Sequence, residues 1–460
     1  MTTDPASAIV HVGDPSGDIP IPVDGPVERV IVVGAGIAGL VAARALHLSG
    51  VDVVVVEGRD RIGGRTHTID LAGAAVDLGA SWIHDGAGSP TLPLVDALGI
   101  ERMPASSTGI AIGASVLNRV DGVFPDVDAR NALTAAMGGL VMSAAQLDEV
   151  ESGVDLEQAM GTLISAIDAN VRGTLGALLS MNEGKDADEV DFAAFAALFF
   201  GSGAEHEDVM PRGGYRGVVE HLAGGLDIRT SHPVRRIAQD SEGVTVETSS
   251  ESFTGTHVLV TVPLGVLKAS MIEHDPPLPS AHLDAIERVG FGVLEKVALA
   301  YERAVWQIDG EPGHITVVDS PRPEWPVILD LSTWYGVPVV VALATGDHGR
   351  ALAAMPEAER VATLHATICE IGGPRTPDPI AFATTSWATD PYVFGCYANI
   401  APGTHPAQHA ADLTTLATPH GRVLFAGEHT CERGTSTVDS AWITGVREAS
   451  RLLQQREVPL

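Results

Sequence analysis

The 460-residue chain contains three lysines, and one of them, Lys296, lies in an apolar stretch. The sequence GFGVLEKVALAY, from Gly290 to Tyr301, places small and apolar residues at two-residue spacing, which predicts a largely buried strand. A buried ammonium is costly unless it is paired or its pKa falls far enough to leave it neutral. Two interpretations follow: a cation held in a functional site, or a lysine that snorkels from an edge strand.

A second chemical signal lies near the N-terminus, in RVIVVGAGIAGLVAARALHLSGVDVVVVE. An apolar strand ends at Val33, and Gly34, Gly36 and Gly39 then complete a G-x-G-x-x-G turn before a helix. The helix N-terminus offers free N–H groups to a pyrophosphate, and Glu57, at the end of the next strand, offers a carboxylate to ribose hydroxyls. The stretch therefore predicts a dinucleotide site, but the glycine spacing does not distinguish NAD from FAD.

Further motifs resemble the flavin-containing amine oxidase family. The first strand pair is followed by EGRDRIGGRTHT and DLGASWIHDG. The family's middle segments are matched by DVMPRGGYRGVVEHLAGGLDIRTSHPVRRI and VLVTVPLGVLKASMIEHDPPLP, and its closing FAD segment is similar to VLFAGEHTCERGTSTVDSAWITGVREA. The resemblance runs from about Val27 onward and implies FAD. It also implies roles for particular residues: Arg65 would clamp a phosphate, Val234 would meet adenine, and the N–H groups of Thr437 and Val438 would face flavin O2.

The full set of cofactor contacts implied by the resemblance combines the two glycine turns with the middle and closing segments. The alternative interpretation of Arg65 is a surface ion-pair residue, and that of Trp82 is a residue of the hydrophobic core. The implied contacts are Gly34, Gly36, Ile37, Ala38, Gly39, Glu57, Arg59, Gly64, Arg65, Gly79, Ala80, Ser81, Trp82, Val234, Trp387, Glu428, Thr437 and Val438.

The same resemblance implies a catalytic role for Lys296, which matches a family lysine that approaches flavin N5 through a water. A cation there would lower the cost of the negative charge that forms when reduced flavin gives electrons to oxygen. His84, in SWIHDG, matches a position at the mouth of the flavin pocket, where it could tune which substrate nitrogen is neutral. The alternative for His84 is a turn histidine beside Asp85.

Other residues bear on the substrate and on how the cofactor is held. Tyr397 resembles one wall of an aromatic pair that sandwiches substrate amines, whereas Thr437 replaces the second wall, which leaves room for a longer substrate. Glu205 and Asp208 could bind distal ammonium groups, or they could belong to a solvated acidic loop. Cys396 matches a cysteine that tethers FAD in monoamine oxidases, but we expect FAD to be non-covalent, with the tether as the alternative.

The order of these segments predicts the elements that position the site. We expect an α/β protein with a doubly wound, Rossmann-like FAD-binding domain built from residues 28–95, 212–275 and 415–460. Residues 96–211, which are rich in helix patterns, and residues 276–414 should form an α+β substrate-binding domain, whose mixed sheet carries Lys296. Residues 1–27 read as a polar N-terminal arm without an export signal. Both domains are therefore discontinuous in sequence.

Composition limits the partners. The net charge of −31 excludes a generic nucleic-acid binder and could steer a cationic substrate. The aliphatic runs are too short to span a bilayer, and three scattered cysteines predict a reducing, cytoplasmic location without disulfides. No metal site is predicted, and the sequence leaves monomer and homodimer open.

The predicted function is a FAD-dependent polyamine oxidase that takes a small cationic amine and O2. A primary-amine or diamine oxidase is the main alternative. An L-amino-acid oxidase is disfavoured because GASWIHDG offers no arginine for a substrate carboxylate. A non-catalytic flavin-fold protein is disfavoured because Glu57, Arg65, Lys296 and Glu428 all occur together. A histone-demethylase-like role is disfavoured too, since no long coiled-coil insertion or additional N-terminal helical module is apparent.

Overall fold

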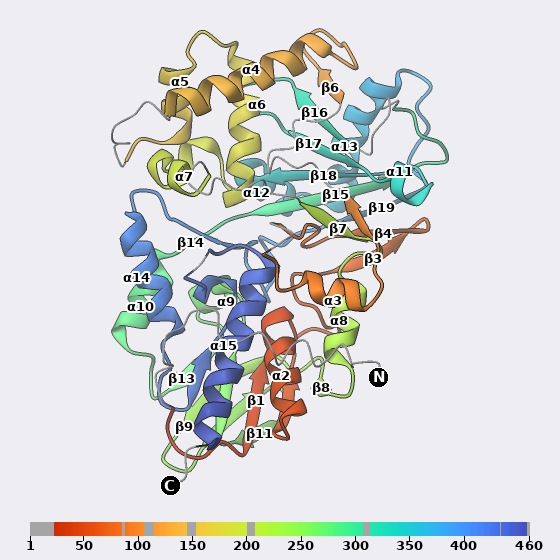
Figure 1. Ribbon diagram of the computed structural model, residues 1–460. Helices are drawn as coiled ribbons and strands as arrows, with labels where there is room; N and C mark the ends of the chain where they lie inside the picture. The colour runs from red at the N-terminus through yellow and green to blue at the C-terminus, as the bar shows by residue number, and fades with distance from the viewer. Residues whose placement is uncertain are drawn as a thin grey trace.

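The computed structural model of the chain describes residues 23–84, 88–104, 115–144, 153–199, 208–306, 313–432 and 434–457. Figure 1 shows two lobes, one above the other, each built around a β-sheet. The chain passes between the lobes more than once, because strands of each sheet come from segments that lie far apart in the sequence.

A five-stranded parallel sheet forms the centre of the lower lobe. Along β1, successive side chains point to opposite faces. Val30 and Val32 pack in one core with α2 (Ile37–Leu48) and α15 (Val438–Glu457), and Ile31 and Val33 pack in another core on the opposite face. The strand order is β21 (Val423–Phe425), β12 (His257–Val260), β1 (Arg29–Val33), β2 (Asp52–Val56) and β8 (Asp227–Arg229).

A smaller mixed sheet and three helices cover that opposite face. Ile237, Val246 and Phe253 of the sheet share a core with Ile31 and Val33. The sheet has the order β11 (Ser252–Gly255), β10 (Val244–Thr248), β9 (Val234–Gln239) and β13 (Glu273–Asp275); the helices are α9 (Leu264–Lys268), α10 (Ser280–Arg288) and α14 (Pro406–Ala417).

The upper lobe contains a six-stranded mixed sheet with a core on each face. Val297 and Leu299 face the core that includes α12 (Gly346–Ala354) and α13 (Glu357–Gly372). Ala298 and Ala300 face the other core, with α4 (Val127–Ala144), α5 (Leu156–Leu163) and α6 (Ala169–Ser180). The strand order is β19 (Ala381–Thr384), β15 (Leu294–Ala300), β18 (Val339–Thr345), β17 (Val327–Asp330), β16 (His314–Val318) and β6 (Ser115–Asn118).

Short elements complete the fold, and several of them lie where the two lobes meet (Figure 1). Three pairs of short strands are β3 (Thr68–Leu71) with β4 (Ala74–Asp77), β5 (Arg102–Pro104) with β7 (Val209–Pro211), and β14 (Gly290–Phe291) with β20 (Ala398–Asn399). The remaining helices are α3 (Leu92–Ala97), α7 (Phe192–Phe199), α8 (Arg216–Ala223), α11 (Ser332–Tyr335), η1 (Met181–Glu183), η2 (Ala187–Glu189) and η3 (Glu428–Thr430).

The chain is a mixed α/β protein with one parallel sheet and further mixed sheets, as predicted. The five parallel strands come from segments 28–95, 212–275 and 415–460, although the domain boundaries themselves remain a prediction. The interpretation of Lys296 as a snorkelling edge-strand residue is wrong, because β15 lies between β18 and β19 and the lysine is only 2% exposed. In the described part of the chain, no helix has the length and apolar character to cross a membrane.

Candidate active site

One cavity of about 820 Å³ is lined by both predicted glycine turns, by residues of the upper sheet and by the start of α15. Its volume lies in the upper part of the range that small-molecule and cofactor sites occupy, about 300 to 1,000 Å³. The cavity thus connects the predicted nucleotide cradle in the lower lobe with the sheet that carries Lys296.

The first glycine turn has the geometry of an anion cradle. Gly34 has a φ of +111°, which favours glycine, and a Cβ on Gly39 would lie 2.0 Å from the Gly34 carbonyl oxygen. A Cβ on Gly36, in contrast, would meet no protein atom within 4 Å and would project into open space. Gly36 is also the N-cap of α2, which has no side-chain cap and no acidic residue in its first turn. These observations fit a phosphate group bound at the start of α2, where Ile37 and Ala38 line the cavity.

Glu57 lies at the end of β2, with its side chain fixed by the backbone. Its Oε2 accepts a hydrogen bond from Ala35 N (2.7 Å), and its Oε1 accepts one from Arg59 N (2.9 Å). The residue is 7% exposed and lines the cavity beside the glycine turn. Each carboxylate oxygen has a further lone pair, so the predicted contact with ribose hydroxyls is compatible with this arrangement.

Arg59 and Trp387 form part of the cavity wall next to Glu57. The Arg59 guanidinium makes an ion pair with Asp390 (2.7 Å) and lies 5.6 Å from the centroid of the Trp387 ring and 5.2 Å from that of Tyr392. The Trp387 indole N–H donates to the Leu78 carbonyl oxygen at 3.0 Å. The predicted contact Val234, at the start of β9, also lines the cavity. Tyr392 was not identified from the sequence.

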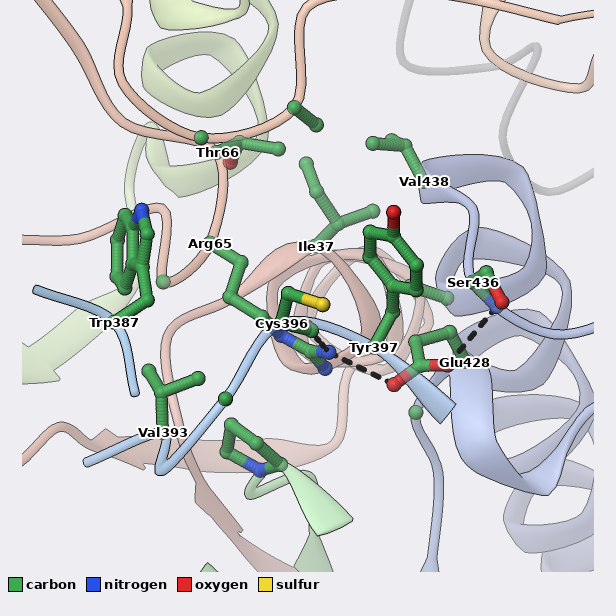
Figure 2. A pocket seen from close by; sticks show the side chains of 18 of the residues that line it. Ile37, Arg65, Thr66, Trp387, Val393, Cys396, Tyr397, Glu428, Ser436 and Val438 are labelled. Atoms are coloured by element: carbon green, nitrogen blue, oxygen red, sulfur yellow. Dashed lines mark hydrogen bonds and ion pairs between the residues drawn. The ribbon is translucent and has the colours of Figure 1, made fainter. Parts of the chain in front are cut away.

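The partly buried Arg65 and the buried Glu428 form an ion pair in the lining of the cavity (Figure 2). Arg65 Nη1 donates to Glu428 Oε1 (2.8 Å) and to the Cys396 carbonyl oxygen (2.6 Å). Glu428 Oε2 accepts from the backbone N–H groups of Ala398 and Ser436. Burial alone would raise the pKa of Glu428, but Arg65, His429 and the Ser436 N–H hold it below its usual value. Arg65 is therefore not a surface ion-pair residue, and its contact with a phosphate remains a prediction.

The start of α15 points a second helix N-terminus at the cavity. Thr437 and Val438 both line the cavity, and the Thr437 hydroxyl accepts a hydrogen bond from Ser440 N at 3.0 Å. The free N–H groups of this first turn and the positive end of the helix dipole favour negative charge in the ligand. This arrangement is compatible with the expected contacts to the pyrimidine end of a flavin.

The second glycine turn holds Lys296. A Cβ on Gly79 would lie 1.7 Å from the Arg65 carbonyl oxygen, so the turn packs directly on the neighbouring backbone. Lys296 Nζ donates to the carbonyl oxygens of Asp77 (3.0 Å) and Gly79 (2.7 Å) and to Ser81 Oγ (2.8 Å). Burial lowers the pKa of Lys296 to about 8, and the nearby Asp77 carboxyl opposes that shift.

Lys296 also lies beside an aromatic wall. Its Nζ is 5.6 Å from the centroid of the Trp82 ring, within the range of a cation–π contact. Trp82 and Ala80 line the cavity together with Lys296, so Trp82 is not confined to the core. Because the three N–H groups of the ammonium already have protein acceptors, a water bound here would share one of them. The predicted water contact is not tested by this geometry.

Glu295, which the sequence analysis did not single out, fixes the loop behind Lys296. Its carboxylate accepts from the Thr385 hydroxyl (2.5 Å) and from the backbone N–H groups of Trp387 (2.9 Å) and Ala388 (2.8 Å). Glu295 is 1% exposed and points to the opposite face of β15 from Lys296. It therefore positions Trp387 and is not itself part of the cavity lining.

His84 and Asp208 meet at the cavity, although they are far apart in sequence. His84 Nδ1 lies 3.0 Å from Asp208 Oδ2, with side-chain exposures of 50% for the histidine and 7% for the aspartate. Both residues line the cavity. The partner of His84 is thus Asp208, whereas Asp85 and Glu205 lie outside the described residues. Asp208 is not part of a solvated loop, because it is buried against His84.

Tyr397 and Cys396 line the cavity beside Arg65 (Figure 2). The Tyr397 hydroxyl donates to the Met181 carbonyl oxygen at 2.5 Å, which fixes the ring. Cys396 is 8% exposed, and burial raises the pKa of its thiol well above the usual value. Residues of the upper lobe that the sequence did not reveal also line the cavity: Leu178, Met181, Asn182, Glu183, Leu294, His314, Val327 and Leu343.

Comparison with known proteins identifies the family of the chain. The model of the family described as "Flavin containing amine oxidoreductase" matches residues 37–453. Protein FLOWERING LOCUS D of Arabidopsis thaliana is 33% identical over 450 residues, which cover 93% of this chain and 55% of that protein. Polyamine oxidase 4 of Oryza sativa subsp. japonica is 29% identical over 469 residues, covering 94% of this chain and 90% of that protein.

Several of the curated relatives are longer than this chain, which spans about half the length of lysine-specific histone demethylase 2 of Homo sapiens at 29% identity. Among solved structures, wild-type putrescine oxidase bound to putrescine has a TM-score of 0.73 and 24% identity, covering 95% of this chain and 100% of that one. At this identity the structural similarity establishes a shared fold.

Proposed function

The chain belongs to the flavin-containing amine oxidoreductase family, and from that premise we propose that it is a polyamine oxidase holding FAD without a covalent bond. The observation that carries the proposal is the continuous cavity, which is lined both by the glycine turn at the start of α2 and by Lys296, Tyr397 and the His84–Asp208 pair. As part of the proposal the protein works in the cytoplasm, which is consistent with three cysteines that form no disulfide.

The residues around the cavity fit FAD. The N-terminus of α2 and Arg65 would hold its phosphates. The N-terminus of α15 would hold the pyrimidine end of its ring, and Glu57 would hold a ribose. When bound, FAD would supply the acceptor for the hydride on the carbon beside the amine nitrogen, and the two electrons taken from the amine would then reduce O2 to hydrogen peroxide. Water then hydrolyses the imine to an aminoaldehyde and the released amine, so each turnover consumes one O2 and one water.

The side chains of this protein orient the amine and control its charge. Asp208 holds one nitrogen of His84, so the other ring nitrogen is available to a substrate nitrogen at the cavity mouth. Tyr397 supplies one aromatic wall, and position 437, with Thr instead of an aromatic ring, leaves the opposite side open to a long, flexible chain. Lys296 provides a cation in a region from which water is largely excluded.

A hydrogen-peroxide release assay tests the proposal. The panel contains putrescine, spermidine, spermine, their N-acetyl forms, benzylamine and a peptide with a methylated lysine. We expect spermidine or spermine to give the highest kcat/KM and the purified protein to be yellow, with about one FAD per chain. Faster oxidation of benzylamine would favour a monoamine oxidase, and turnover of the peptide alone would favour a demethylase. A colourless protein that stays inert after incubation with FAD would exclude the enzyme.

The Asp208→Asn variant tests whether the Asp208 carboxylate contributes to polyamine binding. Loss of the carboxylate should raise KM for spermidine at least about tenfold, with a smaller effect on benzylamine. Asp96→Asn is the control, since Asp96 pairs with Arg102 at the surface and lies outside the cavity lining. Equal changes for both amines in Asp208→Asn would argue against a role of Asp208 in polyamine binding.

A further inference from the structure

His314 is a buried polar residue in the wall of the substrate side of the cavity. It is the first residue of β16, is 5% exposed and lines the cavity. Ile315 and Val317 of the same strand pack in the core on the far face of the sheet. Because successive residues of a strand alternate between faces, His314 and Thr316 lie on the cavity face. The strand therefore directs the imidazole toward the cavity.

The sheet register places His314 on the same wall as Lys296. Across neighbouring strands, Lys296 pairs with Leu343, Leu343 with Val327, and Val327 with Thr316, two residues from His314. Lys296, Leu343, Val327 and His314 all line the cavity. Three strand spacings, roughly 14 Å between backbones, separate β15 from β16. The wall thus has an apolar centre with a polar side chain near each end.

Trp82 connects these two polar side chains. Its ring stacks on that of His314, with centroids 6.4 Å apart and an interplanar angle of 19°, and Lys296 Nζ lies near the same indole. The stacking fixes the plane of the imidazole. An extended substrate whose reacting carbon lies near Lys296 would follow Trp82 and the apolar side chains toward His314.

The imidazole has unused hydrogen-bonding capacity. His314 Nε2 is buried and has no hydrogen-bond partner among the residues that the structure describes. A buried polar atom without a partner carries a free-energy penalty that a ligand can relieve. Burial also lowers the pKa of His314 to about 4, so the ring is neutral at pH 7 and one of its nitrogens has a free lone pair. An ammonium, which has only donors, is a suitable partner for that lone pair.

The cavity carboxylates are less available for this purpose. Asp208 is paired with His84, and Glu57 and Glu428 accept hydrogen bonds from protein donors. Glu183 also lines the cavity, from η1 at the end of α6, and is the competing candidate.

We infer that His314 is a specificity-determining residue that binds the second nitrogen of a di- or polyamine, an assignment that rests on the proposed function. It favours substrates with two nitrogens over monoamines of equal length, because an alkyl end would leave Nε2 buried without a partner. The residue binds the distal end of the substrate and takes no part in the oxidation.

The test compares pairs of ligands that differ only in the distal amine: 1,4-diaminobutane with butylamine, 1,6-diaminohexane with hexylamine, and 1,8-diaminooctane with octylamine. Dissociation constants are measured by calorimetry without oxygen, on holoenzyme whose flavin has been reduced beforehand and so cannot oxidise the amine. We expect wild type to bind at least one diamine about tenfold or more tightly than its monoamine. His314→Phe, which keeps an aromatic ring against Trp82, should abolish that preference.

The controls separate a specific effect from damage to the fold. His314→Gln keeps a hydrogen-bond acceptor and should restore part of the preference. His274→Phe changes another histidine, outside this cavity, whose ring nitrogens are buried without hydrogen-bond partners among the described residues, and it should leave the preference intact. FAD content and Tm confirm that each variant is folded.

Because the flavin is reduced before binding, this experiment is independent of turnover. A holoenzyme that oxidises no amine but shows the His314-dependent preference would contradict the proposed function and retain the inference. An unchanged preference in His314→Phe would overturn the inference, as would a preference lost in Glu183→Gln alone. Tighter binding of N-acetylated diamines through His314 would also overturn it, because the imidazole would then bind a carbonyl.

Discussion

Lys296 and Glu428 are buried charges of the same cavity, and their surroundings affect their pKa values in opposite ways. Lys296 has only neutral oxygens as hydrogen-bond acceptors, and burial lowers its pKa to about 8. For Glu428, the neighbouring Arg65 and His429 and the Ser436 N–H hold the pKa below the usual value despite burial. Lys296 is therefore a residue whose charge can change near neutral pH, whereas Glu428 stays ionised.

Lys296→Met tests the cationic role. In the FAD-loaded variant, reoxidation of the reduced flavin by oxygen should slow at least about tenfold, about 1.4 kcal/mol on the barrier. In wild type the cation is present below its pKa, so the rate should fall as pH rises through about 8, and Lys296→Met should lose this dependence. Stopped-flow absorbance measures both, with Lys268→Met as the control, since Lys268 is exposed on α9 outside the cavity. An unchanged rate in Lys296→Met would refute the role.

Cys396 leads to a prediction about how the cofactor is held. Attack on the flavin methyl group requires a thiolate, and burial raises the pKa of this thiol well above its usual value. We therefore expect acid or heat precipitation to release all of the FAD into a yellow supernatant, from wild type and Cys396→Ala alike. A yellow pellet from wild type, together with a flavin mass on the peptide that contains Cys396, would show a covalent bond.

At the scale of the element, the start of α2 separates two roles of glycine. Gly39 permits close packing of the helix on the turn, because its Cβ would lie 2.0 Å from the Gly34 oxygen. Gly36 has a φ of −80°, which any residue adopts, and its Cβ would meet nothing in the protein. We therefore expect Gly36 to serve the ligand, whereas Gly39 serves the fold.

Paired alanine variants test this separation. Gly39→Ala should lower the free energy of unfolding by roughly 1 to 3 kcal/mol, because the helix must move away from the turn. Gly36→Ala should change it by less than about 1 kcal/mol and weaken FAD binding at least about tenfold, because the methyl group would occupy ligand space. Urea denaturation and flavin fluorescence titration of the apoproteins measure the two effects. Wild-type FAD affinity in Gly36→Ala would show that the cradle does not bind the cofactor.

At the scale of the whole molecule, the net charge of −31 creates a negative field around a cavity whose lining includes Asp208. Such a field raises the association rate of cations and is screened by salt. Spermidine carries more positive charge than benzylamine and should gain more from the field. Charge of this size affects the approach of the substrate and not the fold.

Salt dependence tests the steering. Between about 20 and 200 mM NaCl the kcat/KM for spermidine should fall several-fold, with kcat nearly constant, because screening shortens the reach of the field. For benzylamine the decrease should be smaller. Steady-state kinetics with peroxide detection measures how kcat/KM depends on salt concentration for each amine. An equal dependence for the two amines would contradict electrostatic steering.

The sequence alone determined the features that depend on neighbouring residues. The turn at Gly34, Gly36 and Gly39 is local, since the allowed backbone angles and the missing Cβ atoms specify it within six residues. The two-residue alternation around Lys296 likewise predicted a buried strand, and the structure has β15 there. The ordered motifs led to the family, which the comparisons confirm.

Only the tertiary structure decided which distant residues meet. His84 and Asp208 are 124 positions apart, and Arg65 reaches Glu428 across 363. His314 faces the cavity because of the register of the upper sheet, and Glu295 fixes Trp387 because β15 runs past that loop. Pairings of this kind depend on how strands align and lobes pack, and local sequence patterns specify the face of a strand but not the partner opposite it.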